Sequence, residues 1–376
     1  MAYALFWSAG VLLALGSFGY PILLWVWAQL APRRTVESLQ RLPTVSVVLP
    51  CYNEAPYIAA KIENLLGLAY PAELLELVLV CDGSTDRTAA IVSSFLPHPQ
   101  LRLFELSQRH GKPNALNTGV AAATGELILF SDSRQLFNAG ALQALVSHFA
   151  DPQVGAVSGT LLDFGHRPGE RSGKRFVLGA WFRQLENRLK IWESQIHSVV
   201  GVYGALYAIR RSLYRPLPVN VILDDMAVPF SIIEQGYRVS FEPAAQAIEP
   251  SKPSPTIEIG RRRRIFTGNF QFMCAGNQLY RFRTNPILVQ WLLHKGVRMV
   301  FPFLIAQLFV ANLFIAGPFY DYLLLAQLSV HALCLVGMVF KKPAFFYLFS
   351  QFNISVLRGF HAAVTKSYSV KWQKQT

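Results

Sequence analysis

Three acidic residues follow apolar, strand-like segments in the first part of the chain, and they are the residues best placed to do chemistry. Glu54 follows the run TVSVVLP, Asp82 closes LELVLVCD, and Asp132 closes ELILFSD. A carboxylate can accept hydrogen bonds from a base or ribose, and it can bind a hard divalent cation through oxygen. A single acid in such a place could equally cap the next helix, as Ser84 or Asp86 could. Three acids at strand ends favour a ligand site.

The third acid lies in the segment Ser131-Asp132-Ser133-Arg134, which has an arginine where a second metal-binding acid would stand. Magnesium is often held by one or two carboxylates together with substrate phosphates. We therefore predict a divalent cation, Mg²⁺ or Mn²⁺, bound through Asp132. Two roles are open for Arg134: it points away or pairs with a neighbouring acid, or it meets a diphosphate and weakens the need for the metal.

Two further features could act on a phosphate-bearing substrate. Lys112 begins a predicted helix, where it can neutralise phosphate. The pair Asp224-Asp225 precedes another predicted helix that ends at Gly236. Asp225 could be a general base that removes a proton from an attacking hydroxyl, or it could simply interact with the helix dipole.

The elements around these residues indicate an α/β fold. Apolar, β-branched runs at 44–50, 75–82, 101–106 and 126–132 alternate with segments of helical spacing. Such repeats predict a central, mostly parallel sheet, and ligands bind beyond the carboxyl ends of parallel strands. The three acids are therefore expected in one crevice.

The later part of this region continues the pattern. QVGAVSGTL and YRVSFEP are predicted strands, WFRQLENRLKIWESQIHSVV is a predicted helix, and GVYGALYAIRRSLY is an apolar run ending in two arginines. The chain has no G-x-G-x-x-G after its first strand and no G-x-x-x-x-G-K-[ST] motif. These absences exclude the usual dinucleotide-binding dehydrogenase and P-loop NTPase.

The composition places part of the chain in a membrane. The chain is 52% hydrophobic and only 15% charged, with a formal net charge of +13. Residues 1–32 contain no Asp, Glu, Lys or Arg, which favours a transmembrane anchor over a signal peptide because the stretch is long and its start lacks a cation. Residues 299–320 and 322–340 are also free of these four residue types. They are predicted to span the membrane as two helices.

The predicted order along the chain is an anchor, a cytoplasmic catalytic domain, an interfacial amphipathic helix, two transmembrane helices and a membrane-associated or re-entrant tail, over residues 1–32, 33–285, 286–298, 299–340 and 341–376. The Lys and Arg residues beside each apolar segment favour a cytoplasmic domain. We expect an integral protein of a bacterial inner membrane. The stretch 343–364 is predicted to be interfacial because crossing would bury Arg358.

The run Arg261-Arg262-Arg263-Arg264 precedes the later apolar segments. It could face anionic lipid headgroups or, as a third possibility, nucleic acid. Fixed guanidinium groups can also stabilise the charge of a leaving diphosphate. We expect at least one of these arginines in the site and no nucleic-acid partner.

These motifs together resemble the membrane-bound family 2 glycosyltransferases, which are inverting enzymes with the GT-A nucleotide-sugar fold. The resemblance covers residues 44–300 and rests on P-x-Y-N-E after the first strand, VCDGSTDRT, GKPNALNTG, an Asp after the fourth strand, the acidic pair and the Arg-rich segment. It implies a nucleotide-sugar donor, which we expect to be UDP-linked, and a lipid-linked or membrane-associated glycan acceptor.

The resemblance also implies roles for individual residues. Donor-binding residues would be Pro50, Tyr52, Glu54, Asp82, Lys112, Asn117 and Asp132. Asp132 would be the metal ligand and Asp225, next to Asp224, the base. Arg264 matches the arginine of the Q-x-x-R-W motif of many processive members, while Arg261 and Ile265 replace its glutamine and tryptophan. That departure predicts transfer of one sugar or a few, in polysaccharide or envelope-glycan synthesis.

Two alternatives from other classes are compatible with the sequence. A non-catalytic relative could keep the fold and bind a sugar nucleotide or a partner protein, and Arg134 is the substitution that supports this alternative. A nucleotidyltransferase of similar fold would instead make activated sugars and release pyrophosphate. The retained Lys112 and Asp225 favour a catalytic glycosyltransferase over the first. The apolar segments disfavour the second, whose reaction is soluble.

Overall fold

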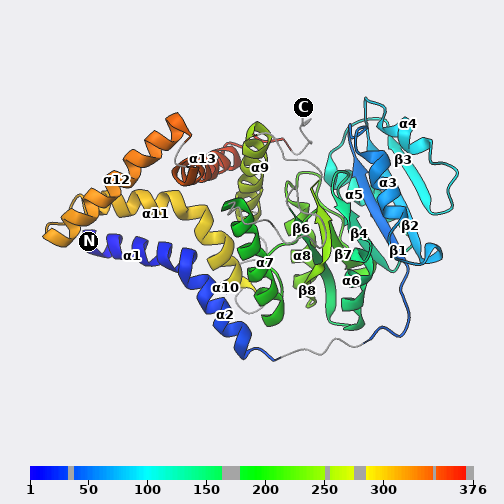
Figure 1. Cartoon of the computed structure of the whole chain (residues 1–376), viewed down its shortest axis with the longest axis horizontal. Coiled ribbons are helices and arrows are strands. Elements are labelled where there is room, and N and C mark those ends of the chain that lie inside the picture. Colours follow the sequence, from blue (N-terminus) through cyan, green and yellow to red (C-terminus); the bar gives the residue numbers. More distant parts are fainter. Residues whose placement is uncertain (33–37, 163–177, 250–254, 275–284, 342–343, 370–376) are drawn as a thin grey trace. The chain divides into compact units, whose positions relative to one another are not determined.

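The structure is a computed structural model that describes residues 1–32, 38–162, 178–249, 255–274, 285–341 and 344–369. The chain forms two compact units, one made of helices and one built around a β-sheet (Figure 1). The helical unit comprises Met1–Val26, Pro253–Arg281 and Leu288–Tyr368. The sheet unit comprises Trp27–Lys252, Phe282–Ile287 and Ser369–Thr376.

The sheet unit contains an eight-stranded sheet with the order β3-β2-β1-β4-β7-β6-β8-β5. In the part of the sheet ordered β3-β2-β1-β4, each strand is parallel to its neighbour. Strands β6 and β8 are also parallel, and β7 runs antiparallel between β4 and β6. The predicted mostly parallel sheet is therefore confirmed. The strands are β1 Val45–Cys51, β2 Leu75–Asp82, β3 Leu101–Leu106, β4 Leu127–Ser131, β5 Leu136–Phe137, β6 Val154–Leu162, β7 Leu206–Arg210 and β8 Arg238–Ile248.

The helices of this unit connect the strands. They are α3 Ile58–Leu66, α4 Thr88–Ser93, α5 Lys112–Ala122, α6 Ala141–Ser147, α7 Leu178–Ile196 and α8 Asp224–Glu234. Short 3-10 turns lie at Ala72–Leu74, His148–Ala150 and Arg211–Leu213. Because β1, β2 and β4 are parallel, their carboxyl ends meet at one edge of the sheet.

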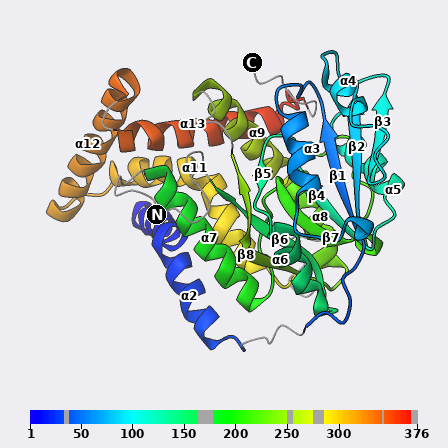
Figure 2. The same cartoon turned by 45° about the vertical axis from the view of Figure 1, so that its right-hand side comes forward.

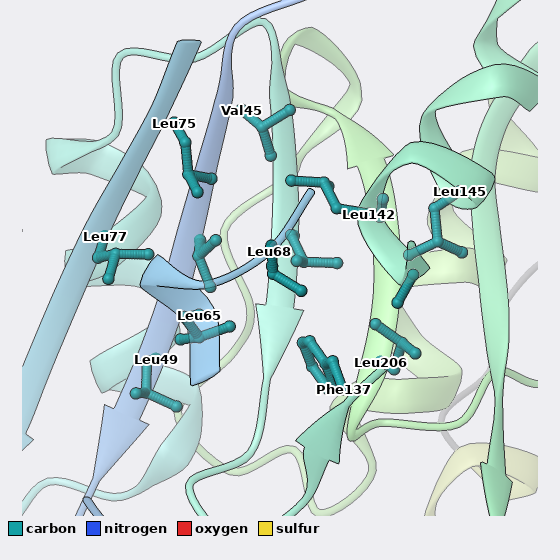
Figure 3. Packing of buried hydrophobic residues seen from close by; sticks show 14 of the residues in the cluster. Val45, Leu49, Leu65, Leu68, Leu75, Leu77, Phe137, Leu142, Leu145 and Leu206 are labelled. Atoms are coloured by element: carbon teal, nitrogen blue, oxygen red, sulfur yellow. The ribbon is translucent and has the colours of Figure 1, made fainter. Parts of the chain in front are cut away.

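Both faces of the central strands are buried, which explains why these strands are continuous apolar runs. Side chains alternate between the faces: Val45, Val47 and Leu49 of β1 belong to the core that includes α3 and α6 (Figure 3). Val48 points to the other face, against α5. There, a Cβ added at Gly119 would lie 2.5 Å from Val48 Cγ1, so glycine permits the close packing of helix on sheet.

The helical unit contains three helical stretches that are long and apolar enough to cross a membrane, among the residues that the structure describes: Ala2–Leu30, Leu288–Asn312 and Pro318–Phe340. Their elements are α1 Ala2–Ala14, a π-helical turn Leu15–Gly19, α2 Tyr20–Leu30, α10 Leu288–Trp291, a second π-helical turn Leu292–Gly296, α11 Val297–Asn312 and α12 Pro318–Phe340. The sequence separated an interfacial helix at 286–298 from a span starting at Met299. In the structure one helical stretch runs from Leu288 to Asn312.

The two remaining helices, α9 Pro255–Cys274 and α13 Ala344–Val364, pack along one another (Figure 2). The rings of Phe266 and Phe352 lie 5.3 Å apart, and those of Phe270 and Phe360 lie 5.4 Å apart. Helix α13 is not among the three spanning candidates. Its predicted interfacial placement, like the orientation of the whole protein, stays a prediction.

Replacing Leu65 by alanine should lower the free energy of unfolding of the sheet unit by about 2–5 kcal/mol, because Leu65 is fully buried between α3 and the sheet. Chemical denaturation of the purified chain in detergent measures this change. The matched substitution Leu96→Ala, at a side chain that is 40% exposed, should change it by no more than about 0.5 kcal/mol. Equal effects of the two substitutions would contradict the packing described.

Candidate active site

One lysine links the carboxyl end of β4 to the start of α8. Lys112 is the first residue of α5, and its Nζ lies 3.0 Å from Asp132 Oδ1 and 3.0 Å from Asp224 Oδ2. Its side chain is 10% exposed and that of Asp224 is 7% exposed, whereas Asp132 keeps 39% of its surface accessible. The structure thus brings together three residues that the sequence placed in the site.

Nearby carboxylates keep Lys112 protonated although its side chain is buried. Burial on its own would lower the pKa of Lys112, but the nearby charges of Asp132, Asp224 and Asp225 raise it above its ordinary value. The lysine is therefore a permanent cation. Lys112 faces more than one carboxylate, and the accessible carboxylate of Asp132 can bind a further cation.

Asp82 organises the loop that precedes α5. Its carboxylate is fully buried and accepts hydrogen bonds from the backbone N–H of His110 at 2.8 Å and of Gly111 at 2.7 Å. Gly83 has a φ of +63°, and a Cβ added there would lie 2.6 Å from the backbone N of Arg109. Only glycine fits this contact. Asp82 and Gly83 therefore fix the position from which α5 and Lys112 start.

The loops after β1 and β2 are held together by side-chain contacts. Asn53, in the left-handed region with φ 55°, accepts a hydrogen bond from the N–H of Thr85 at 2.8 Å. The N–H of Glu54 donates to Thr88 Oγ1 at 2.8 Å. Asp86 accepts from the N–H of Thr88 at 2.9 Å, just before α4. The two loops form one rigid wall of the site.

Arg134 pairs with a neighbouring acid. Its Nε donates to Glu54 Oε2 at 2.8 Å, and its guanidinium carbon lies 4.8 Å from the ring centroid of Tyr57. Burial raises the pKa of Glu54, and the charge of Arg134 partly opposes this. Of the two roles left open for Arg134, pairing with an acid is the one the structure shows.

The two acids at the start of α8 face different surroundings. Asp224 contacts Lys112, while Asp225 lies beside the segment that leads into β7. A Cβ added at Gly204 would lie 3.2 Å from Asp225 Cβ and 3.5 Å from Asp225 Oδ2. The N–H of Val202 donates to the Asp225 carbonyl at 3.3 Å. Glycine at 204 therefore leaves the Asp225 carboxylate bordered by bare backbone, a contribution that the sequence did not reveal.

The remaining predicted donor residues have contacts within the protein. Asn117 donates to the Leu217 carbonyl at 2.8 Å and accepts from the Tyr214 hydroxyl at 2.6 Å, so its amide joins α5 to the segment after β7. The Pro50 carbonyl accepts from Ser133 Oγ at 3.3 Å. The Tyr52 ring lies under the Arg109 guanidinium, a neighbour that the sequence reading did not include.

The arginine run belongs to the helical unit. Arg261 and Arg264 lie on α9, where Arg261 is exposed and the neighbouring Arg262 pairs with Glu258 at 2.9 Å. Their predicted contact with a diphosphate stays a prediction. Within the described residues, no cluster of three or more His, Cys, Asp or Glu side chains could hold a metal by itself. Asp132, with its accessible carboxylate, fits a metal that shares its other ligands with a substrate.

Comparison with known proteins supports this arrangement. Residues 46–217 match the family model for glycosyl transferase family 2. The poly-beta-1,6-N-acetyl-D-glucosamine synthase of Staphylococcus aureus is 26% identical over 216 residues, which are 55% of this chain and 50% of the relative. Its counterpart in Staphylococcus epidermidis is 26% identical over 214 residues, with the same shares. The chain thus spans about half the length of the curated relatives it matches.

A solved structure is similar over nearly the whole chain. The mannosyltransferase PcManGT from Pyrobaculum calidifontis, in complex with GDP-Man and Mn²⁺, has a TM-score of 0.72 and 27% sequence identity. The similarity covers 98% of this chain and 100% of that one. Family match, sheet order and the acids at the strand ends agree: residues 46–217 are similar to glycosyl transferase family 2, and the fold of the chain is similar to that of a GT-A glycosyltransferase.

Proposed function

We propose that this protein transfers one sugar, or a few, from a nucleoside diphosphate sugar to a hydroxyl of a lipid-linked or membrane-associated glycan acceptor, with inversion at the anomeric carbon. One observation carries the proposal: Lys112 holds Asp132 and Asp224 together, and Asp225 stands next to them beside Gly204. This arrangement supports a role for Lys112 as a cation for the donor and for Asp225 as a base for the acceptor, at one edge of the sheet.

The donor side is supported by the rigid loops after β1 and β2. Tyr52 offers an aromatic face for stacking, and Lys112 offers a permanent cation beside which a diphosphate can lie. Glu54 and Asp82 are partly occupied by Arg134 and by backbone N–H groups. Each carboxylate retains lone pairs that can accept from a ribose or base.

The acceptor side is supported by the position of Asp225. Its carboxylate would remove the proton from the acceptor hydroxyl as that oxygen attacks the anomeric carbon on the side opposite the diphosphate. The bond from the anomeric carbon to the diphosphate oxygen breaks as the new glycosidic bond forms, and the electron pair leaves with the diphosphate. A single displacement inverts the configuration.

A divalent cation, Mg²⁺ or Mn²⁺, would be held by Asp132 and the donor phosphates, and when bound it would stabilise the charge of the leaving diphosphate. The residues fit such an ion because the carboxylate of Asp132 remains accessible. Arg134 does not remove this capacity, since it is paired with Glu54. The non-catalytic alternative therefore loses the feature that supported it.

A membrane-associated acceptor is supported by the three apolar helical stretches in the same chain as the site. We propose that the protein sits in a bacterial inner membrane with the sheet unit in the cytoplasm, where nucleotide sugars are made. Arg261 and Ile265 stand where processive enzymes of the family have glutamine and tryptophan. The proposed product is accordingly short.

Asp225→Asn should lower the rate of sugar transfer by about 100-fold or more, because asparagine cannot take the acceptor proton. Binding of the donor, measured by calorimetry, should stay within about twofold of wild type. Glu234→Gln removes an exposed carboxylate at the other end of α8 and should leave both quantities unchanged. Wild-type transfer by Asp225→Asn would take the base role away from Asp225.

Complete chelation of divalent cations should abolish transfer, and adding Mn²⁺ or Mg²⁺ should restore it, because an ion held by Asp132 and the donor phosphates would stabilise the leaving diphosphate. Arg134→Ala should remain metal-dependent, since Arg134 is engaged with Glu54. The transfer assay is run with and without chelator on both proteins. Activity that survives chelation in wild type but not in Arg134→Ala would show that the arginine replaces the ion.

Purified protein given a nucleotide sugar and a lipid-linked acceptor should add one residue or a few, which mass spectrometry of the extracted lipid would show. Screening several nucleotide sugars identifies the donor. Long polymer from a single nucleotide sugar would refute the proposed product length while leaving the transferase activity in place.

A further inference from the structure

Arg109 is held in the proposed donor site with hydrogen-bonding capacity that the described residues do not use. Its guanidinium carbon lies 4.0 Å from the ring centroid of Tyr52, so the two planar groups are in contact. Its Nε and Nη2 atoms are buried and have no hydrogen-bond partner among the described residues. A buried donor without an acceptor is costly, and a ligand that supplies an acceptor recovers that cost.

Contacts with Gly83 and Asp82 fix the backbone around Arg109. It packs against Gly83, where an added Cβ would lie only 2.6 Å from the Arg109 N. The next two residues, His110 and Gly111, donate their N–H groups to Asp82. The side chain therefore starts from a rigid base three residues before Lys112, and only its own torsions are left to adjust.

We infer that Arg109 reads the base of the nucleotide donor, and that it selects a base that presents a carbonyl oxygen, uracil or guanine, over one that presents an amino group. This inference rests on the proposed function and deepens it. A guanidinium can only donate hydrogen bonds, and Nε with Nη2 forms a planar, two-pronged edge. Guanine offers O6 and N7 to such an edge, and uracil offers O4. Adenine and cytosine place an amino donor at the same position, so two donors would meet.

Contact with the Tyr52 ring holds the Arg109 guanidinium in place. A base that accepts from both Nε and Nη2 lies near the plane of the guanidinium. Lysine could supply the charge of Arg109 but has no planar fork. Arg109→Lys therefore separates recognition of the base from simple attraction of an anion.

The test is calorimetry of the full chain in detergent with Mn²⁺, using UDP, GDP, CDP, ADP and inorganic pyrophosphate. Wild type should bind UDP or GDP at least about 10-fold more tightly than CDP and ADP, which is the discrimination expected of a guanidinium reading a base. Arg109→Met and Arg109→Lys should both reduce that difference to about twofold or less. Pyrophosphate, which has no base, should bind all three proteins equally.

A matched control comes from a second arginine stacked on an aromatic ring. Arg102 lies 5.4 Å from the Phe104 ring on β3 and donates to the Ala122 carbonyl, away from the strand ends of the site. Arg102→Met should keep the wild-type preference among the bases. The inference would be overturned if Arg109→Met kept the preference among the bases or if wild type showed no such preference. It would also be overturned if Arg109→Met lost affinity for pyrophosphate. If wild type binds none of the nucleoside diphosphates, the proposed function is overturned as well.

Discussion

The shared ammonium of Lys112 is the interaction on which the site depends. It lies between Asp132, at the end of β4, and Asp224, at the start of α8, and it is largely removed from water. Carboxylates this close repel one another strongly in a poorly solvated region, and the lysine makes their proximity tolerable. Its removal would leave buried like charges uncompensated, a defect that ordinarily costs several kcal/mol. The cation therefore has a structural role before any substrate arrives.

The geometry that serves Lys112 comes from the sheet order. Strands β1, β2 and β4 end at the same edge because they are parallel, and β7 returns antiparallel between β4 and β6. The reversal sets the glycine-containing segment before β7 beside Asp225. The groups that we propose to bind the donor and the acceptor thus come from separate stretches of sequence, which meet where β4 pairs with β7. Each stretch keeps its own packing on the sheet.

Much of this could be predicted from the sequence, for identifiable reasons. Strands β2 and β3 were predicted with their observed bounds. Strand β2 is the buried apolar run typical of a parallel strand, whereas β3 lies at the edge of the sheet and carries the exposed Arg102 and Glu105. The two-residue β5 and the short helix α6 were not predicted, because neither is long enough to establish a periodicity. The antiparallel direction of β7 depends on pairing with distant strands, which no local pattern encodes.

In the site too, features that depend on local sequence were predicted, and features that depend on contacts between distant segments were not. Motif-bearing residues such as Lys112 and Asp132 were predicted, since their types and spacing carry the chemistry. The contribution of Gly204 and the stacking of Arg109 on Tyr52 were not, because each depends on contacts between loops that are far apart in the chain. The predicted division at residue 299 between an interfacial helix and a span falls inside one helical stretch, Leu288–Asn312, and stays a prediction. The basic residues Lys295 and Arg298 lie within the continuous helical stretch and were read as its flank.

The pairing of Arg134 with Glu54 couples two positions that follow different strands. Arg134 Nε lies 2.8 Å from a carboxylate whose side chain is only 18% exposed. The substitution Arg134→Asp would remove this partner and would set acids at positions 54, 132 and 134 around a space served by Lys112. A second acid two residues after Asp132 is therefore compatible with this site only if position 54 changes as well.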